Sequence, residues 1–491
     1  MTRAAALLLL AALGCPFAPP PAAVAASGPP ATFAALAASA RHTLAATMYA
    51  GAGRWRTCLA PACPAVHSDW GADALTYALF LRWEQRPDAQ LAAIFRALVT
   101  TAPVYDACRG RACRTWSDVP EWDAIAALRM FRVTADPRAL RRAEAAFWSV
   151  ELSDAFALGA CPEVRYQHPF GGGGGLKTLE TDANSVKAAL LLFAATHDAR
   201  YLGAARRRYR AIRRRFLDAS LALYTVYVLD DGARCRQIPR RFFASVNGDM
   251  IWSGLALAHA TGDSHYRRDA FATAHAVDRL LADGRGVFAN LQAENDVAEP
   301  LVEAMASVAQ VGGGSFAGAW VARNAEAAAA NARRADGTYG RFADGPAPTA
   351  PATAWQTNGG LALAIVAGAL FPHRVVAPDA SWSRSVRSTV DLAAFPARVH
   401  VRGTGVALIG TLGERCCEGG HARVFVDGRE TVDGTGIWQN KSSAGRPFPG
   451  SVLFAWRWSS RGDHIVELRA GEPNPKEGGP FVRVTREQVI P

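Results

Sequence analysis

Lysine is scarce in this 491-residue chain, where only four of the 54 basic residues are lysine: Lys177, Lys187, Lys441 and Lys476. The remaining basic residues are arginines, and they are scattered along the chain instead of forming a nucleic-acid-binding motif. We therefore predict no nucleic-acid partner despite a net charge of +11. The arginines indicate either a surface without a dedicated ligand or a surface that attracts an acidic glycan.

Long apolar runs and metal-ligand spacings are lacking too. No run of about 20 apolar residues follows the N-terminal segment, so we predict no transmembrane segment. The histidines show no metal-binding spacing, and no second Cys or His pair follows at finger-like distance, so we predict no metal and no other cofactor. Gly171–Gly175 is not followed by Gly-Lys-Ser/Thr, which excludes a phosphate loop and predicts a flexible rim loop.

The N-terminus has the features of a signal peptide spanning residues 1–25. Arg3 supplies a positive charge, Ala4–Leu13 form a short apolar stretch, and Ala23–Ala25 offer small residues for cleavage. We therefore predict a secreted or periplasmic protein. Lipoprotein anchoring at Cys15 is a weaker alternative, because Ala12 stands where a larger aliphatic residue is expected.

Cysteine usage agrees with export. Beyond Cys15 there are eight cysteines, an even number that would tend to pair in an oxidising compartment. The sequence favours two short-loop disulfides, Cys58/Cys63 and Cys108/Cys113, and one long-range disulfide, Cys161/Cys235. The remaining cysteines, Cys416 and Cys417, are adjacent in the sequence. Eight cysteines allow 105 connectivities, so other pairings stay open.

Between about Ala31 and Leu370, apolar residues recur at helical spacing in twelve segments, which predicts six helical hairpins. The segments begin near residues 32, 73, 88, 121, 137, 184, 199, 249, 264, 297, 315 and 354.

A Thr-x-Asp repeat supports this pairing, because its Asp can cap the helix that follows. It occurs at Thr134–Asp136, Thr196–Asp198 and Thr261–Asp263, with a weaker echo at Asp88.

After Phe371 the sequence changes to short alternating strands separated by Gly, Asp and Pro. Asp427-Gly428 predicts a hairpin turn between two of them. We expect a linker at 373–387 and an antiparallel β-sandwich domain at 388–491. The expected strands are Ala397–Arg402, Val406–Leu412, Ala422–Val426, Val452–Trp458 and His464–Arg469.

Four segments of the helical part together resemble glycoside hydrolase family 76, the endo-α-1,6-mannanases, within the six-hairpin glycosidases. They are Trp116–Trp122, Gly171–Asn184, Phe243–Ile251 and Thr261–Asp263. The resemblance implies a mainly α fold, an (α/α)6 toroid over residues 26–372. The C-terminal segment is similar to sandwich modules appended to exported bacterial proteins.

The resemblance also implies where the chemistry lies. The family uses two adjacent aspartates, but this chain has Ser117 followed by Asp118. Glycoside hydrolysis needs two carboxyl groups, so a substitute for the first aspartate is required. We expect Asp118, Glu121 and Asp123 to be catalytic. Asp69, Glu180 and Asp182 are further carboxylates that could enter the same end of the toroid. The structural alternatives are that Asp118 caps the following helix and that Glu121 and Asp123 lie on its solvated first turn.

Substrate contacts are expected from aromatic and polar residues of the same segments. Indole rings suit the C–H face of sugars, and amide, ammonium or carboxylate groups can bond their hydroxyls. The candidates are Trp70, Trp116, Trp122, Lys177, Asp182, Asn184 and Asn247, each with core packing or structural hydrogen bonding as the alternative.

The leading hypothesis is an exported glycoside hydrolase, monomeric, that cleaves an α-linked polysaccharide resembling α-1,6-mannan. The first alternative is a catalytically inactive protein that binds a polysaccharide or cell-envelope glycan and keeps the toroid, as the loss of one aspartate suggests. The second alternative is a six-hairpin enzyme that acts on uronic-acid glycans.

Overall fold

The computed structural model describes residues 30–60, 63, 65–66, 70–101, 115–171, 174–288, 297–412, 421–431, 437–438, 447–471 and 482–491. The predicted signal peptide, the Cys108/Cys113 pair, Cys416-Cys417 and Asp69 lie outside these residues. Among the residues described, no helix is both long and apolar enough to cross a membrane.

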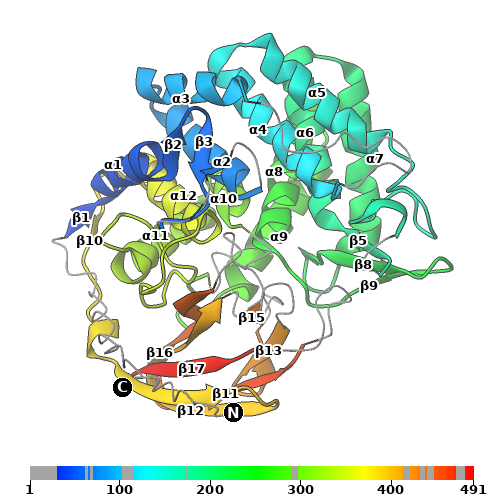
Figure 1. Cartoon of the computed structure of the whole chain (residues 1–491). Helices are drawn as coiled ribbons and strands as arrows, with labels where there is room; N and C mark the ends of the chain where they lie inside the picture. The colour runs from blue at the N-terminus through cyan, green and yellow to red at the C-terminus, as the bar shows by residue number, and fades with distance from the viewer. Residues whose placement is uncertain are drawn as a thin grey trace, which may run out of the picture.

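Twelve α-helices in the described part of the chain form two concentric rings (Figure 1). The even-numbered helices pack side by side in sequence order, and α12 packs against α2 to close the inner ring. The inner helices are α2 (Trp70–Gln85), α4 (Asp118–Thr134), α6 (Leu179–Thr196), α8 (Ala244–Thr261), α10 (Glu299–Ala309) and α12 (Ala354–Leu370). The predicted (α/α)6 toroid is confirmed.

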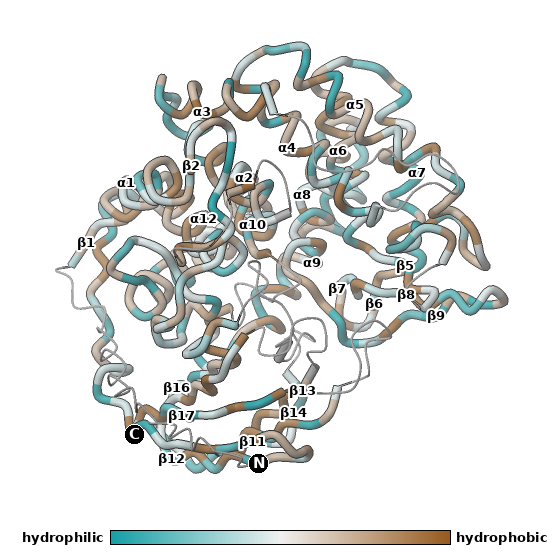
Figure 2. Tube along the Cα trace, viewed as in Figure 1, coloured by the Kyte–Doolittle hydropathy of each residue, from teal (hydrophilic) through white to brown (hydrophobic). Residues whose placement is uncertain are grey.

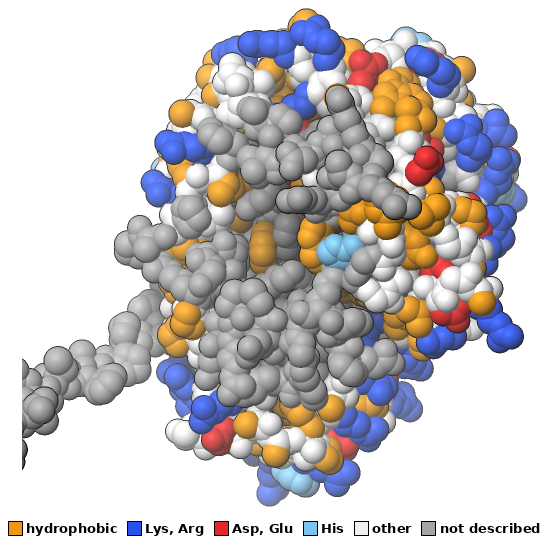
Figure 3. Space-filling view, turned by 45° about the vertical axis from the view of Figure 1, so that its right-hand side comes forward, with side chains coloured by type: hydrophobic (Ala, Val, Ile, Leu, Met, Phe, Trp, Pro, Cys, Tyr) orange, Lys and Arg blue, Asp and Glu red, His pale blue; other side chains and the backbone are white. Residues whose placement is uncertain are grey.

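The outer helices cover the ring and bury one face each. They are α1 (Phe33–His42), α3 (Ala89–Val99), α5 (Pro137–Glu151), α7 (Ala199–Phe216), α9 (Ser264–Leu280) and α11 (Ser315–Ala327). The arginine-rich α7 illustrates this amphipathic pattern, because its hydrophilic residues lie on the outside of the helical domain (Figure 2). In the space-filling view, basic side chains are spread around the periphery of the molecule, and among the described residues these exposed side chains are arginines (Figure 3).

The two ends of the toroid differ in their connections. Short turns join each of α4, α6 and α8 to the next outer helix, and the repeat residues Asp136, Asp198 and Asp263 cap those outer helices as predicted. In each turn the preceding threonine donates to a carbonyl one helical turn back and accepts from the Asp backbone N–H. We call this end, at the last turns of the inner helices, the C-terminal mouth. A cavity of about 850 Å³ lies inside it.

The opposite end, at the first turns of the inner helices, is the N-terminal mouth. Several long connections into inner helices carry short strands: β2 (Tyr49–Gly51), β3 (Arg54–Arg56) and β4 (Ala65–Val66) before α2, β5 (Leu176–Thr178) before α6, and β6 (Leu217–Asp218), β7 (Leu223–Tyr224), β8 (Tyr227–Asp230) and β9 (Cys235–Gln237) before α8. The predicted disulfides Cys58–Cys63 and Cys161–Cys235 are both present in these connections.

The C-terminal part is an antiparallel sheet in the order β11-β17-β12-β16-β13-β14, with β15 paired to β13, and it fits the predicted β-sandwich. Its strands are β11 (Val386–Leu392), β12 (Ala397–Leu412), β13 (His421–Val426), β14 (Arg429–Glu430), β15 (Ile437–Trp438), β16 (Phe448–Ala470) and β17 (Val484–Ile490).

Two pairs of expected strands are each one long strand, β12 and β16. Their register shifts between Gly403 and Gly405, where the partners jump from Gly462 to Arg457, so the strands continue through a bulge. At the predicted hairpin, Asp427 and Gly428 both have positive φ, 49° and 77°, as a tight hairpin turn requires.

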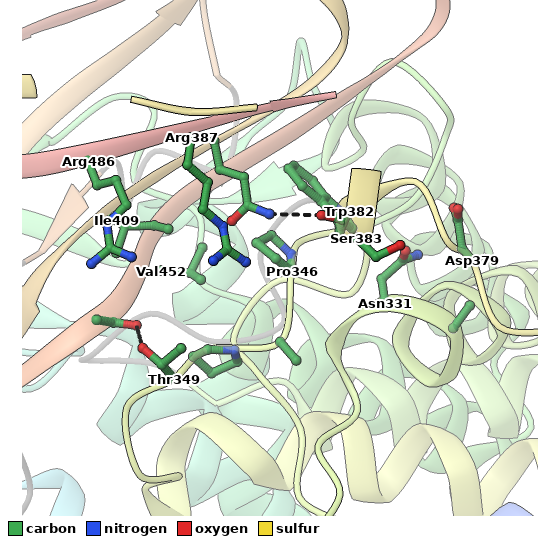
Figure 4. Close-up of a pocket in the computed structure, with 15 residues that line it drawn as sticks. Asn331, Pro346, Thr349, Asp379, Trp382, Ser383, Arg387, Ile409, Val452 and Arg486 are labelled. Carbon is green, nitrogen blue, oxygen red and sulfur yellow. Dashed lines mark hydrogen bonds between the residues drawn. The ribbon is translucent and has the colours of Figure 1, made fainter. Parts of the chain in front are cut away.

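The helical part and the sheet are in direct contact. The backbone N–H of Gly284, after α9, donates to the Arg457 carbonyl of β16 over 2.9 Å, and in the connecting segment the Trp382 indole donates to the Asp344 carbonyl over 2.9 Å while β10 (Val375–Val376) pairs with β1 (Ala31–Thr32). A small cavity of about 50 Å³ lies at this boundary (Figure 4). In that view Arg387 and Arg486 extend from the sheet toward the loop of Pro346 and Thr349.

An ionic cluster reinforces the contact. Arg457 of the sheet lies 3.6 Å from the Asp344 carboxylate and 3.2 Å from that of Asp379. Asp283 is buried beside this cluster, and burial, with the negative charge of Asp344 second, raises the pKa of Asp283 to about 7.

The raised pKa gives a pH-dependent stability. Because the folded-state pKa of Asp283 lies above that of an unfolded aspartate, its contribution is complete below about pH 4 and is lost as pH rises through about 7. We expect the melting temperature to fall less between about pH 5 and 8 in Asp283→Asn than in the wild type. Asp463→Asn, at an exposed site, is the control and should keep the wild-type slope. Equal slopes for all three proteins would contradict the prediction.

Gly248 allows α8 and α10 to approach closely, since a Cβ atom there would lie 2.4 Å from the Leu301 backbone nitrogen. Gly248→Ala should therefore destabilise the protein by roughly 1–3 kcal/mol. Gly203→Ala is the matched control, because a Cβ on α7 meets only the Arg207 side chain at 3.4 Å. Helix propensity should stabilise that variant by about 0.5–1 kcal/mol. Thermal unfolding should therefore show a lower melting temperature for Gly248→Ala and a higher one for Gly203→Ala than for the wild type.

Candidate active site at the N-terminal mouth

The residues that face the lumen can be identified along each inner helix, from the C-terminal mouth to the N-terminal mouth. Residues eleven apart share a helix face, because 3.6 residues make one turn. Asp118 is eleven residues before Arg129 on α4, and Glu180 is eleven before Leu191 on α6. Arg129 and Leu191 line the cavity on the toroid axis. Asp118 and Glu180 therefore belong to the lumen-facing stripe, at the first turns of neighbouring helices.

The same spacing brings further residues to this stripe, among them Glu121, which lies eleven residues before Arg132 on α4. Asp73, Glu299 and Trp355 each lie eleven residues before a residue that lines the cavity: Glu84, Gln310 and Val366 respectively. The N-terminal half of the lumen is therefore rich in carboxylates, with an indole on α12.

Asp118 and Glu180 act on a common neighbour, the phenol of Tyr227. Burial raises the pKa of Tyr227 well above its ordinary value, and the negative charges of Glu180 and Asp118 act in the same direction. The cation Arg241 and a hydrogen bond from Gln167 oppose them. Two carboxylates from different helices are thus near enough to the Tyr227 phenol for their charges to disfavour its ionisation.

Ser117 is the residue that the sequence resemblance aligns with the family's first aspartate, and its surroundings suit a hydroxyl. It is fully buried, its Oγ donates to the Tyr166 carbonyl over 2.8 Å, and it lies 2.5 Å from Thr181 Oγ1. A carboxylate cannot donate to that carbonyl and would meet its oxygen instead.

Among the aromatic candidates, Trp116 and Trp122 differ in exposure. The Trp116 ring is half-buried beside His168, with centroids 4.0 Å apart. Trp122 is only 3% exposed and packs against Tyr77 at 5.4 Å, which makes it a core residue and corrects the expectation of a sugar platform. Trp70 is the first residue of α2, and its side chain lies outside the described part.

Two expected site carboxylates, those of Asp182 and Glu121, are fully buried. Arg208 of α7 bonds Asp182 Oδ1 over 2.9 Å, and the Arg165 backbone N–H bonds the other oxygen. Glu121 is fully buried near Glu151 and Arg208, and burial, with Glu151 second, raises its pKa well above the ordinary value. Asp182 therefore has structural partners in the outer ring, and the Glu121 carboxyl group is enclosed within the helical part.

Three more expected site residues have structural partners. Asp123 pairs with Arg142 of α5, which also bonds the Thr101 carbonyl. Lys177 Nζ is fully buried, donates to three carbonyls at 2.6–2.9 Å, and lies 3.5 Å from Asp230. The Asn247 side-chain amide accepts a hydrogen bond from the Tyr224 backbone N–H and donates one to the Tyr224 carbonyl. The sequence context of these residues did not reveal that they hold loops and helices together.

Asn184 is different, because it lies one helical turn after Glu180 and before Lys187 on the inner stripe of α6. It is 1% exposed, and its Nδ2 has no hydrogen-bond partner among the residues described. A donor without a partner at this depth is available to a polar ligand or water.

Below the mouth, an ion-pair network that sequence reasoning missed fills the lumen. Lys187 of α6 bonds Asp249 of α8 at 2.9 Å and Glu303 of α10 at 2.6 Å, and Arg129 of α4 also pairs with Glu303. Burial would raise the pKa of Glu303, but Arg129 and Lys187 outweigh it and lower the pKa to about 2. Burial, with the negative charge of Glu303 second, raises the pKa of Glu299 well above its usual range and so favours the neutral form of this carboxyl group.

One group of possible metal ligands lies within the described residues: Cys161, Asp230 and Cys235. Its two sulfur atoms form the disulfide, and Asp230 accepts the backbone N–H of Ala160 and Gly232. Because metals bind thiolates, this group does not fit a metal ion in the oxidised protein.

No family model and no curated protein matches the chain. Solved structures do. An α-1,6-mannanase of family 76 from Salegentibacter sp. superposes with a TM-score of 0.60 at 18% identity, covering 69% of this chain and 99% of that one. A family 76 mannosidase from Bacteroides thetaiotaomicron gives 0.56 at 12% identity, covering 69% and 98%. An unsaturated glucuronyl hydrolase specific for heparin gives 0.51 at 12%, covering 68% and 96%.

These similarities show that the helical part has the six-hairpin toroid fold of the family 76 structures, and they leave the C-terminal sheet uncovered. A variant of the Salegentibacter enzyme with two consecutive aspartates replaced by alanine is inactive and forms a complex with α-1,6-mannotetrose.

Ser117→Asp tests whether this position still accepts the family's residue. We expect a destabilised protein without higher activity, because the new carboxylate would be buried against the Tyr166 carbonyl. Ser117→Ala, which only removes the donor, should cost about 1–3 kcal/mol. Melting temperatures and product release check both, and a stable, more active Ser117→Asp would contradict this view.

Proposed function

We propose that this protein is a glycoside hydrolase whose active site is the N-terminal mouth, with Asp118 and Glu180 as its two carboxyl groups. The observation that carries the proposal is their position on the lumen-facing stripe at the first turns of the neighbouring inner helices α4 and α6, where both charges also raise the pKa of the Tyr227 phenol. The toroid fold shared with family 76 hydrolases supports it.

In the proposed reaction, one carboxyl group donates a proton to the glycosidic oxygen while the other activates water. We assign Asp118 as the acid and Glu180 as the base. Ser117 cannot carry the negative charge of the family's first aspartate, so a covalent intermediate formed by an adjacent pair is not available. The expected product therefore has the inverted anomeric configuration.

For the substrate, we propose an α-linked mannan. Similar structures include an α-1,6-mannanase bound to an α-1,6-manno-oligosaccharide. In this chain, the half-buried Trp116 ring beside His168 offers an aromatic surface near Asp118, and Asn184 offers a donor in the lumen. Action outside the cytoplasm fits the two disulfides, which persist in oxidising compartments.

Ser117 favours one alternative, a protein that binds glycans without cleaving them. Its hydroxyl is integrated into bonds with Tyr166 and Thr181, so the position is adapted to the absence of a carboxylate. Under this alternative the toroid would be a docking surface for a cell-envelope polysaccharide.

Product release from α-1,6-mannan, α-glucan, arabinan and a uronic-acid polymer separates these functions. Asp118→Asn and Glu180→Gln should each lower the rate on the preferred polymer at least about 10²-fold, because general acid–base catalysis contributes roughly 10²–10⁴-fold. Asp154→Asn, an exposed isosteric control, should retain the wild-type rate.

Proton NMR of the first product formed gives the anomeric configuration. Inversion supports the assignment of Glu180 as the base, whereas retention would contradict it. Polymer binding without release by the wild type, unchanged in Asp118→Asn, would favour the non-catalytic alternative.

A further inference from the structure

The cavity at the C-terminal mouth is built by all six inner helices and lies on the toroid axis. Its volume of about 850 Å³ is in the range of small-molecule sites. Gln85, Gln310 and Ala194 at its rim are exposed, whereas Arg129 and Glu303 are each only 5% exposed and form its floor. It is therefore an open pocket with a buried, charged base.

The floor offers polar groups in a fixed arrangement. Arg129 and Glu303 form an ion pair, and the Arg129 guanidinium lies 4.4 Å from the centre of the Phe80 ring. Lys187 holds the second oxygen of Glu303 at 2.6 Å. The Nε of Arg129 is buried without a hydrogen-bond partner among the described residues. Such a donor is costly unless a ligand or water satisfies it.

The wall offers an aromatic surface. Trp252 belongs to the inner helix α8 but is only partly buried, so its exposed surface faces the cavity that it lines. Phe80 and Phe131 add aromatic surface from α2 and α4. An indole wall above a floor of hydrogen-bonding groups suits a ring with an apolar face and hydroxyl substituents.

Charge narrows the ligand class. Arg129 and Arg132 balance Glu84 and Glu303, so the lining has no excess of one sign. Hydroxyl groups can donate to the carboxylates and accept from the guanidinium groups. We propose that this cavity is a second carbohydrate site that binds a short neutral oligosaccharide, with one sugar ring against Trp252 and its hydroxyls toward Arg129 and Glu303.

This site is separate from the N-terminal mouth. Asp118 and Arg129 are eleven residues apart on α4, about 17 Å along the helix, and the buried Lys187–Asp249–Glu303 ion pairs link three inner helices on the N-terminal side of the cavity. The inference depends on the cavity's own residues and does not need the N-terminal mouth to be catalytic.

The test uses isothermal titration of the full chain carrying Asp118→Asn, which keeps a hydrolysable probe intact. The probes are α-1,6-mannotriose, maltotriose and the charged trigalacturonic acid. Each of two further changes should weaken binding of a neutral probe at least about tenfold or remove one equivalent of bound sugar. Trp252→Ala deletes the aromatic wall, and Ala194→Trp obstructs the rim.

Two controls accompany these variants. Trp252→Phe should keep most of the affinity, and Trp148→Phe changes a tryptophan packed against Tyr201 in the outer ring and should have no effect. Absence of neutral-sugar binding at about 10 mM, or binding untouched by both Trp252→Ala and Ala194→Trp, would overturn the proposal. Product release by the wild type is a separate measurement of hydrolysis. Loss of the second-site proposal would therefore not contradict the proposed hydrolase, and absence of hydrolysis would not contradict the second site.

Discussion

The structure depends on a set of charges buried in the toroid lumen. Arg129, Lys187, Asp249 and Glu303 come from four inner helices and neutralise one another at the axis. Removing one member would leave an uncompensated buried charge, which costs roughly 3–5 kcal/mol. Because each ion pair joins two helices, the network fixes their rotation. That rotation also turns Asp118 and Glu180 toward the N-terminal mouth and Trp252 toward the opposite cavity.

The two mouths follow from the lengths of the connections. Compact Thr-x-Asp turns leave the C-terminal mouth open and place capped outer helices around it. Longer connections, two of them joined by the Cys161–Cys235 disulfide, build up the N-terminal mouth. A single helical framework thus offers a carboxylate-lined end and an end lined by aromatic and paired charged groups. Loops can vary at one end without disturbing the ion pairs that set the helix positions.

Helical periodicity located all twelve helices, because apolar residues dominate the buried faces. The inner helices α2, α4, α6 and α8 begin three to five residues before the predicted positions. Their first turns are polar, as at Asp118 and Glu180, and so do not continue the apolar pattern. The candidate site was harder to predict. The resemblance to family 76 indicated Asp118, but burial of Asp123 and Lys177 with structural partners depends on contacts from distant segments, which one sequence does not display.

The scarcity of lysine has a practical consequence. The two lysines in the described part of the chain, Lys177 and Lys187, are fully buried and ion-paired, whereas arginines supply the exposed positive charge. Amine-directed reagents, such as succinimidyl esters used for dye labelling or coupling to a solid support, would find no accessible side-chain target on the folded toroid. Coupling chemistry would be confined to Lys441, Lys476 and an amino terminus, so it would not modify the buried ion pairs of Lys177 and Lys187.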